Sequence, residues 1–187
     1  MPSKQVTYVA LLRGINVGGK NKVDMSALKA VFEDAGLRSV RTYINSGNVV
    51  FTSRARSRAR LTSRLEKAIA ARFGFDVKVL VHDLARMRSI VAAMPPDWVN
   101  DHTTKCDVMF LWDAVDRPEI LDELKVKPEI DHVRYVPGAV LWSVDRGNAT
   151  RSALMKVVGT PLYQQMTIRN CNMTRKLLDL MEATEER

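Results

Sequence analysis

The sequence predicts an α+β protein made of two ferredoxin-like halves packed together, each with the element order β-α-β-β-α-β followed by one extra helix. Three observations lead to this prediction. Short apolar, β-rich runs alternate with stripes of apolar residues at helical spacing, Gly and Pro separate these segments, and the order of elements in the first half recurs in the second. The residue identities barely repeat, so the repeat is one of elements and not of sequence.

The first half begins with an apolar strand and is divided by glycines. Asp24 or Ser26 is suited to cap the first helix and Gly36 to end it, while Gly74 stops the second helix. Asn and Gly tolerate a positive φ, so the polar segment 45–48 is expected to form a hairpin turn between two short strands. The predicted strands are 6–12, 40–44, 49–52 and 77–81. The first predicted helix follows its cap, has its apolar stripe within 28–35 and ends at 36, and the other two are 57–73 and 84–94.

The second half follows the same order. Pro118 stands in the first turn of a predicted helix, where its missing N–H costs nothing, and Pro137 with Gly138 supplies a turn. The predicted strands are 107–112, 133–136, 140–144 and 166–168, and the predicted helices are 118–124, 152–158 and 174–182. Paired prolines and polar residues mark 95–104 as a linker, so the first half spans 1–94 and the second 105–187.

Composition and length exclude several classes of protein. The chain is 46% hydrophobic and 27% charged, which is typical of a soluble globular protein and not of a disordered one. No apolar run approaches the roughly 20 residues of a membrane span, and the N-terminus lacks the pattern of a signal peptide, so a cytoplasmic location is expected. Cys106 and Cys171 form no Cys-x-x-Cys unit, and we expect them to be reduced structural thiols.

The excess of positive over negative charge is confined to the first half. The whole chain carries a formal charge of +8, but residues 1–100 hold 17 Lys and Arg against 7 Asp and Glu, whereas residues 101–187 hold 12 against 14. An acidic second half is not expected in a protein that nucleic acid surrounds. Any polyanion would therefore bind the first half.

The loop 13–22 follows a strand and precedes a helix, a position in which backbone N–H groups can bind an anion. Gly14, Gly19 and Lys20 match the spacing of a nucleotide-binding P-loop, but Asn21 replaces the Ser or Thr that would bind magnesium. The helix also begins three to five residues too late for a P-loop. Two alternatives remain, namely a polar binding loop and a loop whose glycines only turn the chain.

Two long motifs, YVALLRGINVGG at 8–19 and YINSGNVVF at 43–51, resemble the bacterial family called domain of unknown function 1697. A third segment, MTIRNCNMT at 166–174, resembles that family's C-terminal motif, so the resemblance covers nearly the whole chain. The resemblance implies a two-part α+β fold and an unassigned function. This chain departs from the family at Cys171, where the family has tryptophan. If that aromatic ring stacks on a ligand, binding here would be weaker or different.

The three motif segments share an abundance of Asn, Arg and Gly and contain no Asp or Glu. Arginine does not titrate near neutral pH and an amide cannot transfer protons, so this set suits binding of an anion better than acid–base catalysis. Arg13, Lys20 and Arg169 would neutralise the anion, and the amides would orient it. The candidate ligand-binding residues are Arg13, Asn16, Gly18, Gly19, Lys20, Asn45, Ser46, Asn48, Arg169, Asn170, Asn172 and Thr174.

Each motif also has a purely structural alternative. The segment 45–48 can be a hairpin turn and nothing more, and Asn172 or Thr174 can simply cap the last helix. The three histidines, His82, His102 and His132, lie in separate contexts, so no metal site and no cofactor are indicated.

Three functional hypotheses follow. The leading one is a cytosolic protein that binds a small anionic ligand bearing phosphate or carboxylate, either as a binding protein or as a small enzyme. The second is nonspecific nucleic-acid binding by the basic first half, where arginines occupy every second position from 54 to 60. The third is a structural or partner-binding protein whose motif loops serve only packing.

Overall fold

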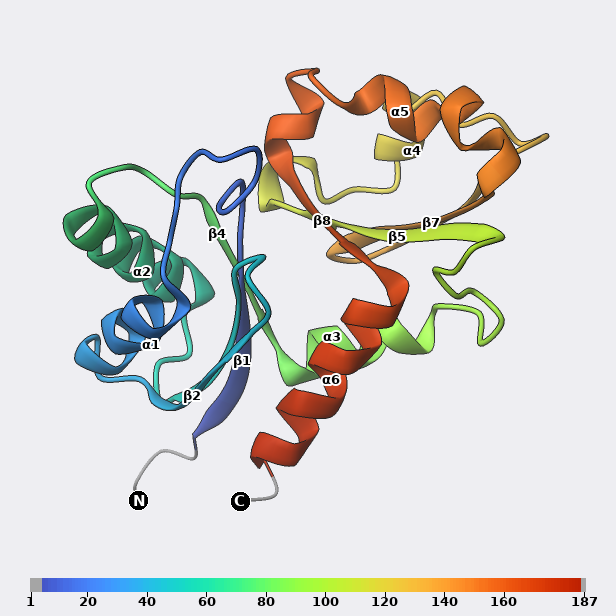
Figure 1. Ribbon diagram of the computed structural model, residues 1–187. Helices are drawn as coiled ribbons and strands as arrows, with labels where there is room; N and C mark the ends of the chain where they lie inside the picture. The colour runs from blue at the N-terminus through green and yellow to red at the C-terminus, as the bar shows by residue number, and fades with distance from the viewer. Residues whose placement is uncertain (1–4, 186–187) are drawn as a thin grey trace. The chain divides into compact units, whose positions relative to one another are not determined.

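A computed structural model describes residues 5–185 and confirms the α+β class, with two four-stranded antiparallel sheets (Figure 1). By internal packing the chain divides into two units. The first comprises the chain up to Met87 and from Leu177 onward, and the second is Arg88–Lys176. Within residues 5–185, no helix is long and apolar enough to cross a membrane.

The sheet of the first unit has the strand order β2-β3-β1-β4. Its strands are β1 (Val6–Leu12), β2 (Arg38–Tyr43), β3 (Asn48–Ser53) and β4 (Val79–Asp83). The central strand β1 pairs antiparallel with both neighbours, so that Tyr8 lies opposite Phe51 and Val9 opposite His82. This order is that of a ferredoxin-like fold, in which the two halves of a split β-α-β unit enclose a central strand.

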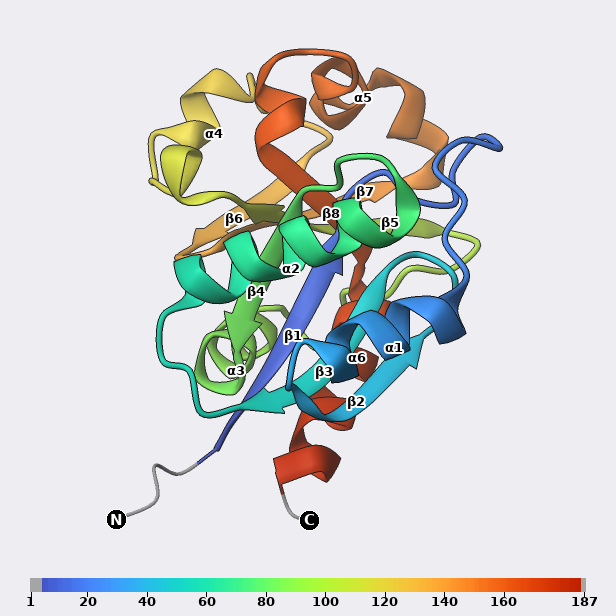
Figure 2. The ribbon, with the colours of Figure 1, turned by 90° about the vertical axis from the view of Figure 1, so that its left-hand side faces the viewer.

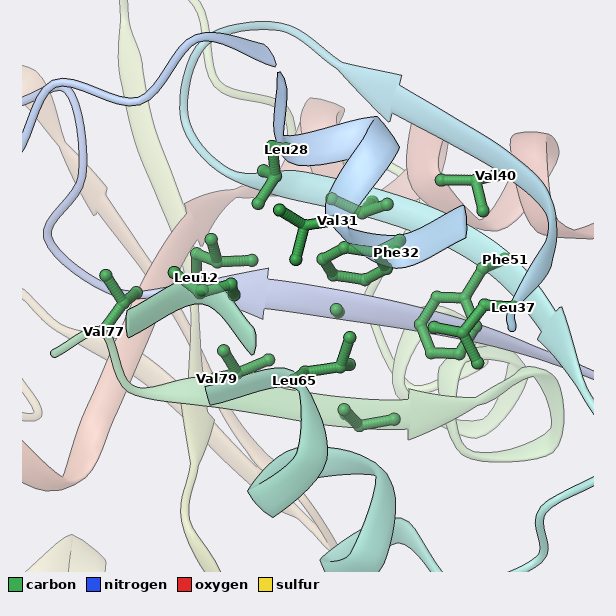
Figure 3. Close-up of a cluster of buried hydrophobic side chains, with 14 of the residues drawn as sticks. Leu12, Leu28, Val31, Phe32, Leu37, Val40, Phe51, Leu65, Val77 and Val79 are labelled. Carbon is green, nitrogen blue, oxygen red and sulfur yellow. The ribbon is translucent and has the colours of Figure 1, made fainter. Parts of the chain in front are cut away.

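Two helices, α1 (Met25–Asp34) and α2 (Arg58–Phe73), cover one face of this sheet (Figures 1 and 2). Figure 3 shows the core between them, where side chains of Leu12 and Val79 from the sheet meet Leu28, Phe32 and Leu65 from the helices. Each such fully buried side chain contributes about 1.5–3 kcal/mol through removal of apolar surface from water.

Two of the four ends of these helices, at Asp24 and Gly74, lie at residues that the sequence predicts. Asp24, rather than Ser26, caps α1, because its carboxylate accepts a hydrogen bond of 2.8 Å from the N–H of Ala27. Ser57 caps α2 in the same way through the N–H of Arg60, and Gly74 ends α2 with a φ of +80°.

The sheet of the second unit repeats the topology, with the order β6-β7-β5-β8. Its strands are β5 (Thr104–Leu111), β6 (His132–Val136), β7 (Ala139–Asp145) and β8 (Met166–Asn170). The two predicted helices are shorter than expected. They are α4 (Ile120–Glu123) and α5 (Ala153–Val157), with the 3₁₀ turns η1 (Asp113–Val115), η2 (Arg146–Arg151) and η3 (Leu162–Gln165) around them. Both lie over one face of the sheet (Figure 1).

The two appended helices are α3 (Leu84–Ala92) and α6 (Cys171–Glu185). Helix α6 begins three residues earlier than predicted, because the side chain of Asn170 accepts a hydrogen bond from the N–H of Met173 and caps it there. Both helices run across the division between the two units. The domain boundaries expected from the sequence, with a linker at 95–104, stay a prediction.

The expectation of reduced cysteines is wrong, because Cys106 and Cys171 form a disulfide. The antiparallel pairing of β5 with β8 places Asp107 opposite Asn170, which brings the two cysteines opposite each other with their Cα atoms 5.5 Å apart. This separation is typical of disulfides. The spacing of 65 residues gave no sign of the pairing, since it depends on strand register across the whole second unit.

A buried carboxylate organises the helical side of the second unit. Asp131 is almost fully buried and accepts hydrogen bonds from the indole of Trp142 (3.2 Å), the hydroxyl of Ser152 (2.6 Å) and the N–H groups of Ala153 (3.1 Å) and Lys127 (3.0 Å). Burial raises the pKa of Asp131, but these hydrogen bonds outweigh it and hold that pKa below its ordinary value.

Reduction of the disulfide should destabilise the protein. The bond closes a loop of 65 residues, so Cys106→Ala with Cys171→Ala should lower the free energy of unfolding by about 4 kcal/mol on the chain-entropy account. Urea unfolding with and without dithiothreitol measures this, because the wild type should respond to the reductant and the double variant should not. Two titratable thiols in the denatured, unreduced protein would contradict the bond.

Asp131→Asn should lower the free energy of unfolding by about 3 kcal/mol at neutral pH, because an amide nitrogen cannot accept from the backbone donors that face it. Because the pKa of Asp131 is lower in the native than in the unfolded state, its ionised carboxylate stabilises the fold above the unfolded-state pKa. This stability is lost as the pH falls below about 4. Urea unfolding at neutral and acid pH should therefore show less acid destabilisation in the variant. Asp122→Asn, at an exposed position, is the control and should change neither quantity.

Candidate functional site

The glycine-rich loop of the first unit ends in a tight turn. The N–H of Lys20 donates to the carbonyl of Val17 at 3.2 Å, and between them Gly18 and Gly19 have φ values of +59° and +75°. Two consecutive positive φ angles are typical of a type I′ turn, which needs such glycines. Helix α1 begins at Met25, so the loop does not run directly from Lys20 into a helix as a P-loop does.

Asn16 braces the base of this loop. Its side-chain oxygen accepts from the N–H of Val23 (2.8 Å), and its nitrogen donates to the carbonyls of Val23 (3.0 Å) and Asn45 (2.9 Å). Asn16 itself has a φ of +55°, a conformation that asparagine tolerates better than most residues. Its amide is therefore engaged within the protein, and it joins the first motif to the second.

The second motif forms the predicted hairpin turn between β2 and β3. Gly47 is buried with a φ of +74°, and its carbonyl accepts a hydrogen bond of 2.8 Å from the N–H of Leu12. Asn48 is fully buried and donates to the carbonyl of Tyr43 (3.1 Å) and the hydroxyl of Ser46 (2.9 Å). Asn48 and Ser46 therefore have structural roles in the turn.

Two predicted cations flank the loop. Arg13 is half-buried at the end of β1, where its N–H donates to the carbonyl of Lys78 at 2.9 Å. Lys20 is exposed at the turn. The structure thus brings the first two motifs together through Asn16, Asn45 and Gly47, with Lys20 at the outer end of the loop.

The third motif belongs to the second unit. Arg169 is buried on β8, and its Nη1 donates to the hydroxyl of Thr167 (3.0 Å) and the carbonyl of Ile168 (2.8 Å). Burial lowers the pKa of Arg169 to about 10, so the guanidinium stays protonated at neutral pH. Its predicted contact with an anion stays a prediction.

The neighbouring polar residues of this motif shape the start of α6. Asn170 caps the helix, whereas Thr174 donates to the carbonyl of Asn170 at 3.0 Å. The amide of Asn172 exchanges two hydrogen bonds with the backbone of Asn100, donating at 2.9 Å and accepting at 3.1 Å. The cap is therefore Asn170 and not Asn172 or Thr174, and Asn172 instead fixes the segment that precedes β5.

A surface groove of about 690 Å³ lies beside the first two motifs, within the first unit. The loop, the hairpin turn, the start of α1 and the end of α2 form its wall. Its polar and aromatic lining residues, together with the backbone of Gly19, are Asn16, Lys22, Asp24, Asn45, Arg72 and Phe73. No local pattern around Arg72 and Phe73 indicates a site, because only the packing of α2 beside α1 brings these residues to the loop.

Three exposed polar side chains of this groove have no hydrogen bond or ion pair within residues 5–185. They are the amide of Asn45, the ammonium of Lys22 and the guanidinium of Arg72, which lies 5.8 Å from the centre of the Phe73 ring. The groove's carboxylate, Asp24, caps α1. The groove can therefore offer two positive charges and one amide beside an aromatic wall. Among the described residues, no group of three or more His, Cys, Asp or Glu could hold a metal ion.

Comparisons with known proteins agree with this architecture. Residues 6–142 match the family described as "Protein of unknown function (DUF1697)". The structure is similar to that of the conserved bacterial protein SP0830 from Streptococcus pneumoniae, with a TM-score of 0.82 and 28% sequence identity over 95% of this chain and 99% of the other. No curated protein matches the chain.

The close approach at Gly47 should make Gly47→Ala far more damaging than Gly19→Ala. The two glycines have nearly equal φ values of +74° and +75°, so both variants carry similar backbone strain. A Cβ at Gly47 would lie 2.7 Å from Cβ of Leu12 and 2.9 Å from Cδ1 of Ile15, whereas at Gly19 it meets nothing within 4 Å. We expect Gly47→Ala to cost about 1–3 kcal/mol more in urea unfolding. Equal losses in the two variants would contradict this packing.

Proposed function

The chain belongs to the DUF1697 family, which has no assigned function, and we propose from its groove that it binds a small ligand bearing phosphate or carboxylate in the first unit. The observation that supports this most directly is the gathering of Lys22, Arg72 and the amide of Asn45 around one hollow, where each side chain is exposed and has no hydrogen bond or ion pair within the described residues.

The chemistry of these three groups suits an anion. The ammonium of Lys22 offers a compact charge, and the guanidinium of Arg72 offers paired N–H donors that match two oxygens of a carboxylate or phosphate. The amide of Asn45 can donate one hydrogen bond and accept another, which fixes the orientation of the ligand. Phe73 supplies an apolar wall for the remainder of the molecule.

The first turn of α1 is not the source of affinity in this proposal. Its N-terminus is already capped by the carboxylate of Asp24, which would repel an anion placed there. The anion would instead lie on the side of the groove formed by Lys22 and Arg72.

This proposal keeps part of the site expected from the sequence and changes the rest. Asn45 stays a ligand-binding candidate, and Gly19 contributes backbone to the groove. Asn16 instead supports the loop, and Lys22 replaces Arg13 as the cation near it. Participation of the third motif, with Arg169, in ligand binding stays a prediction.

The test is a thermal-shift screen with nucleoside monophosphates, sugar phosphates and dicarboxylates, followed by calorimetric titration of each compound that raises the melting temperature. A ligand at 100 times its dissociation constant should stabilise the protein by about 2.7 kcal/mol. Lys22→Gln and Arg72→Gln should each weaken that ligand roughly tenfold, because each removes a charge-assisted hydrogen bond.

The matched control is Lys29→Gln, which removes the same charge from α1 at an exposed lysine outside the groove, 3.7 Å from Glu33. It should leave the affinity unchanged. Unchanged affinity in the Lys22→Gln and Arg72→Gln double variant, or an equal loss in the control, would overturn the proposal.

A further inference from the structure

The outward face of α2 carries a stripe of three cations. At 100° per residue, Arg60, Arg64 and Lys67 fall within about 60° of the helix circumference, and they extend over about 10 Å along its axis. All three are exposed and line a shallow hollow of about 480 Å³. None of the three side chains has a hydrogen bond or ion pair within residues 5–185. We call this set the α2 stripe; Figure 2 shows the helix in front of β1 and β4.

The charge on this face is of one sign. Helix α2 contains five Arg and Lys residues and a single acidic residue, Glu66, whose carboxylate accepts a hydrogen bond of 2.9 Å from the N–H of Val79. Solvated helices commonly mix charges, as α1 does with Lys29 and Glu33 at i and i+4. The α2 stripe has no such compensation, so its positive potential extends into solvent.

The stripe is not the alternating arginine run that stands out in the sequence. Arg54 and Arg56 precede the helix, and Arg58 is half-buried with its guanidinium 3.4 Å from Nδ1 of His82. Arg60 alone of that run joins the stripe, together with two residues further along the helix. Arg54 and Arg56, both exposed, add positive charge just before the N-terminus of α2.

The residues beside the α2 stripe indicate which class of anionic partner it suits. A membrane-binding helix places large apolar side chains beside its cations, but the residues beside this stripe are Ala59, Ser63 and Ala71. Proteins that bind single-stranded nucleic acid stack bases on aromatic side chains, and the stripe offers no aromatic ring. Cations alone, in a line, match the phosphates of a duplex backbone.

We propose that the α2 stripe binds the phosphate backbone of duplex DNA without reading its sequence. The inference is independent of the ligand proposed for the groove, because the two sites share no residue. Neutralised phosphates release counterions, so binding must weaken steeply as salt rises.

The experiment is fluorescence anisotropy of a short labelled DNA duplex, titrated with the full chain across a range of salt concentrations. We expect a dissociation constant of about 10⁻⁴–10⁻⁶ M at physiological salt. The triple variant Arg60→Gln, Arg64→Gln, Lys67→Gln should weaken binding at least about tenfold and make the log–log salt slope less negative by about 3.

The control variant Lys125→Gln, Lys156→Gln, Lys176→Gln removes the same charge from exposed positions of the second unit and should bind like the wild type. Thermal melts check folding, and if the triple variant melts early, Arg60→Gln and Lys67→Gln singly should each reduce the slope by about 1. The proposal is overturned if the wild type does not bind the duplex, if the control loses as much affinity as the stripe variant, or if single strands or phosphatidylglycerol vesicles bind more tightly.

Discussion

The packing of the first unit depends on the absence of a side chain at Gly47. At Gly47 the turn between β2 and β3 approaches the end of β1 so closely that a Cβ would overlap Leu12 and Ile15. The carbonyl of Gly47 can then accept from the N–H of Leu12, and Asn16 can reach the carbonyl of Asn45 from the neighbouring loop. The same contact therefore positions the loop, the turn and the groove beside them. The two longest motifs in the sequence meet at this point, which gives many of their residues a structural explanation.

Most of the fold could be predicted from the sequence, because apolar periodicity and helix-ending residues are read over a few neighbouring positions. The stripe of Leu61, Leu65 and Ile69, closed by Gly74, specifies α2 without knowledge of anything distant. Helices α4 and α5 are shorter than the sequence predicts, because proline and apolar residues indicate a helix but not the residue at which tertiary packing ends it. The disulfide could not be predicted from local patterns, because only the register of β5 and β8, which are distant in the sequence, brings Cys106 and Cys171 together.

The residues of the candidate site also differ in whether a local pattern indicates their role. Asparagine and glycine are informative about backbone conformation, and Asn16, Gly47 and Asn48 prove to serve the backbone. The side chains that remain available, Lys22 and Arg72, carry no local signature that separates them from ordinary surface cations. Both proposed surfaces of the first unit depend on such residues. Part of the excess positive charge of the first half thus lies at a groove at one end of α2 and along a stripe on its outward face.

The turn at Gly18 and Gly19 has a consequence for how this fold can vary. Its backbone is closed by one hydrogen bond between Val17 and Lys20, and no atom lies within 4 Å of a Cβ built at either glycine. Below it, Asn16 and Asn21 hold the two ends of the loop together, with the N–H of Asn16 donating to the carbonyl of Asn21 at 3.1 Å. Lengthening a closed loop costs little chain entropy. Residues can therefore be inserted between Val17 and Lys20, extending the rim of the groove, while the brace beneath keeps the sheet and its helices as they are.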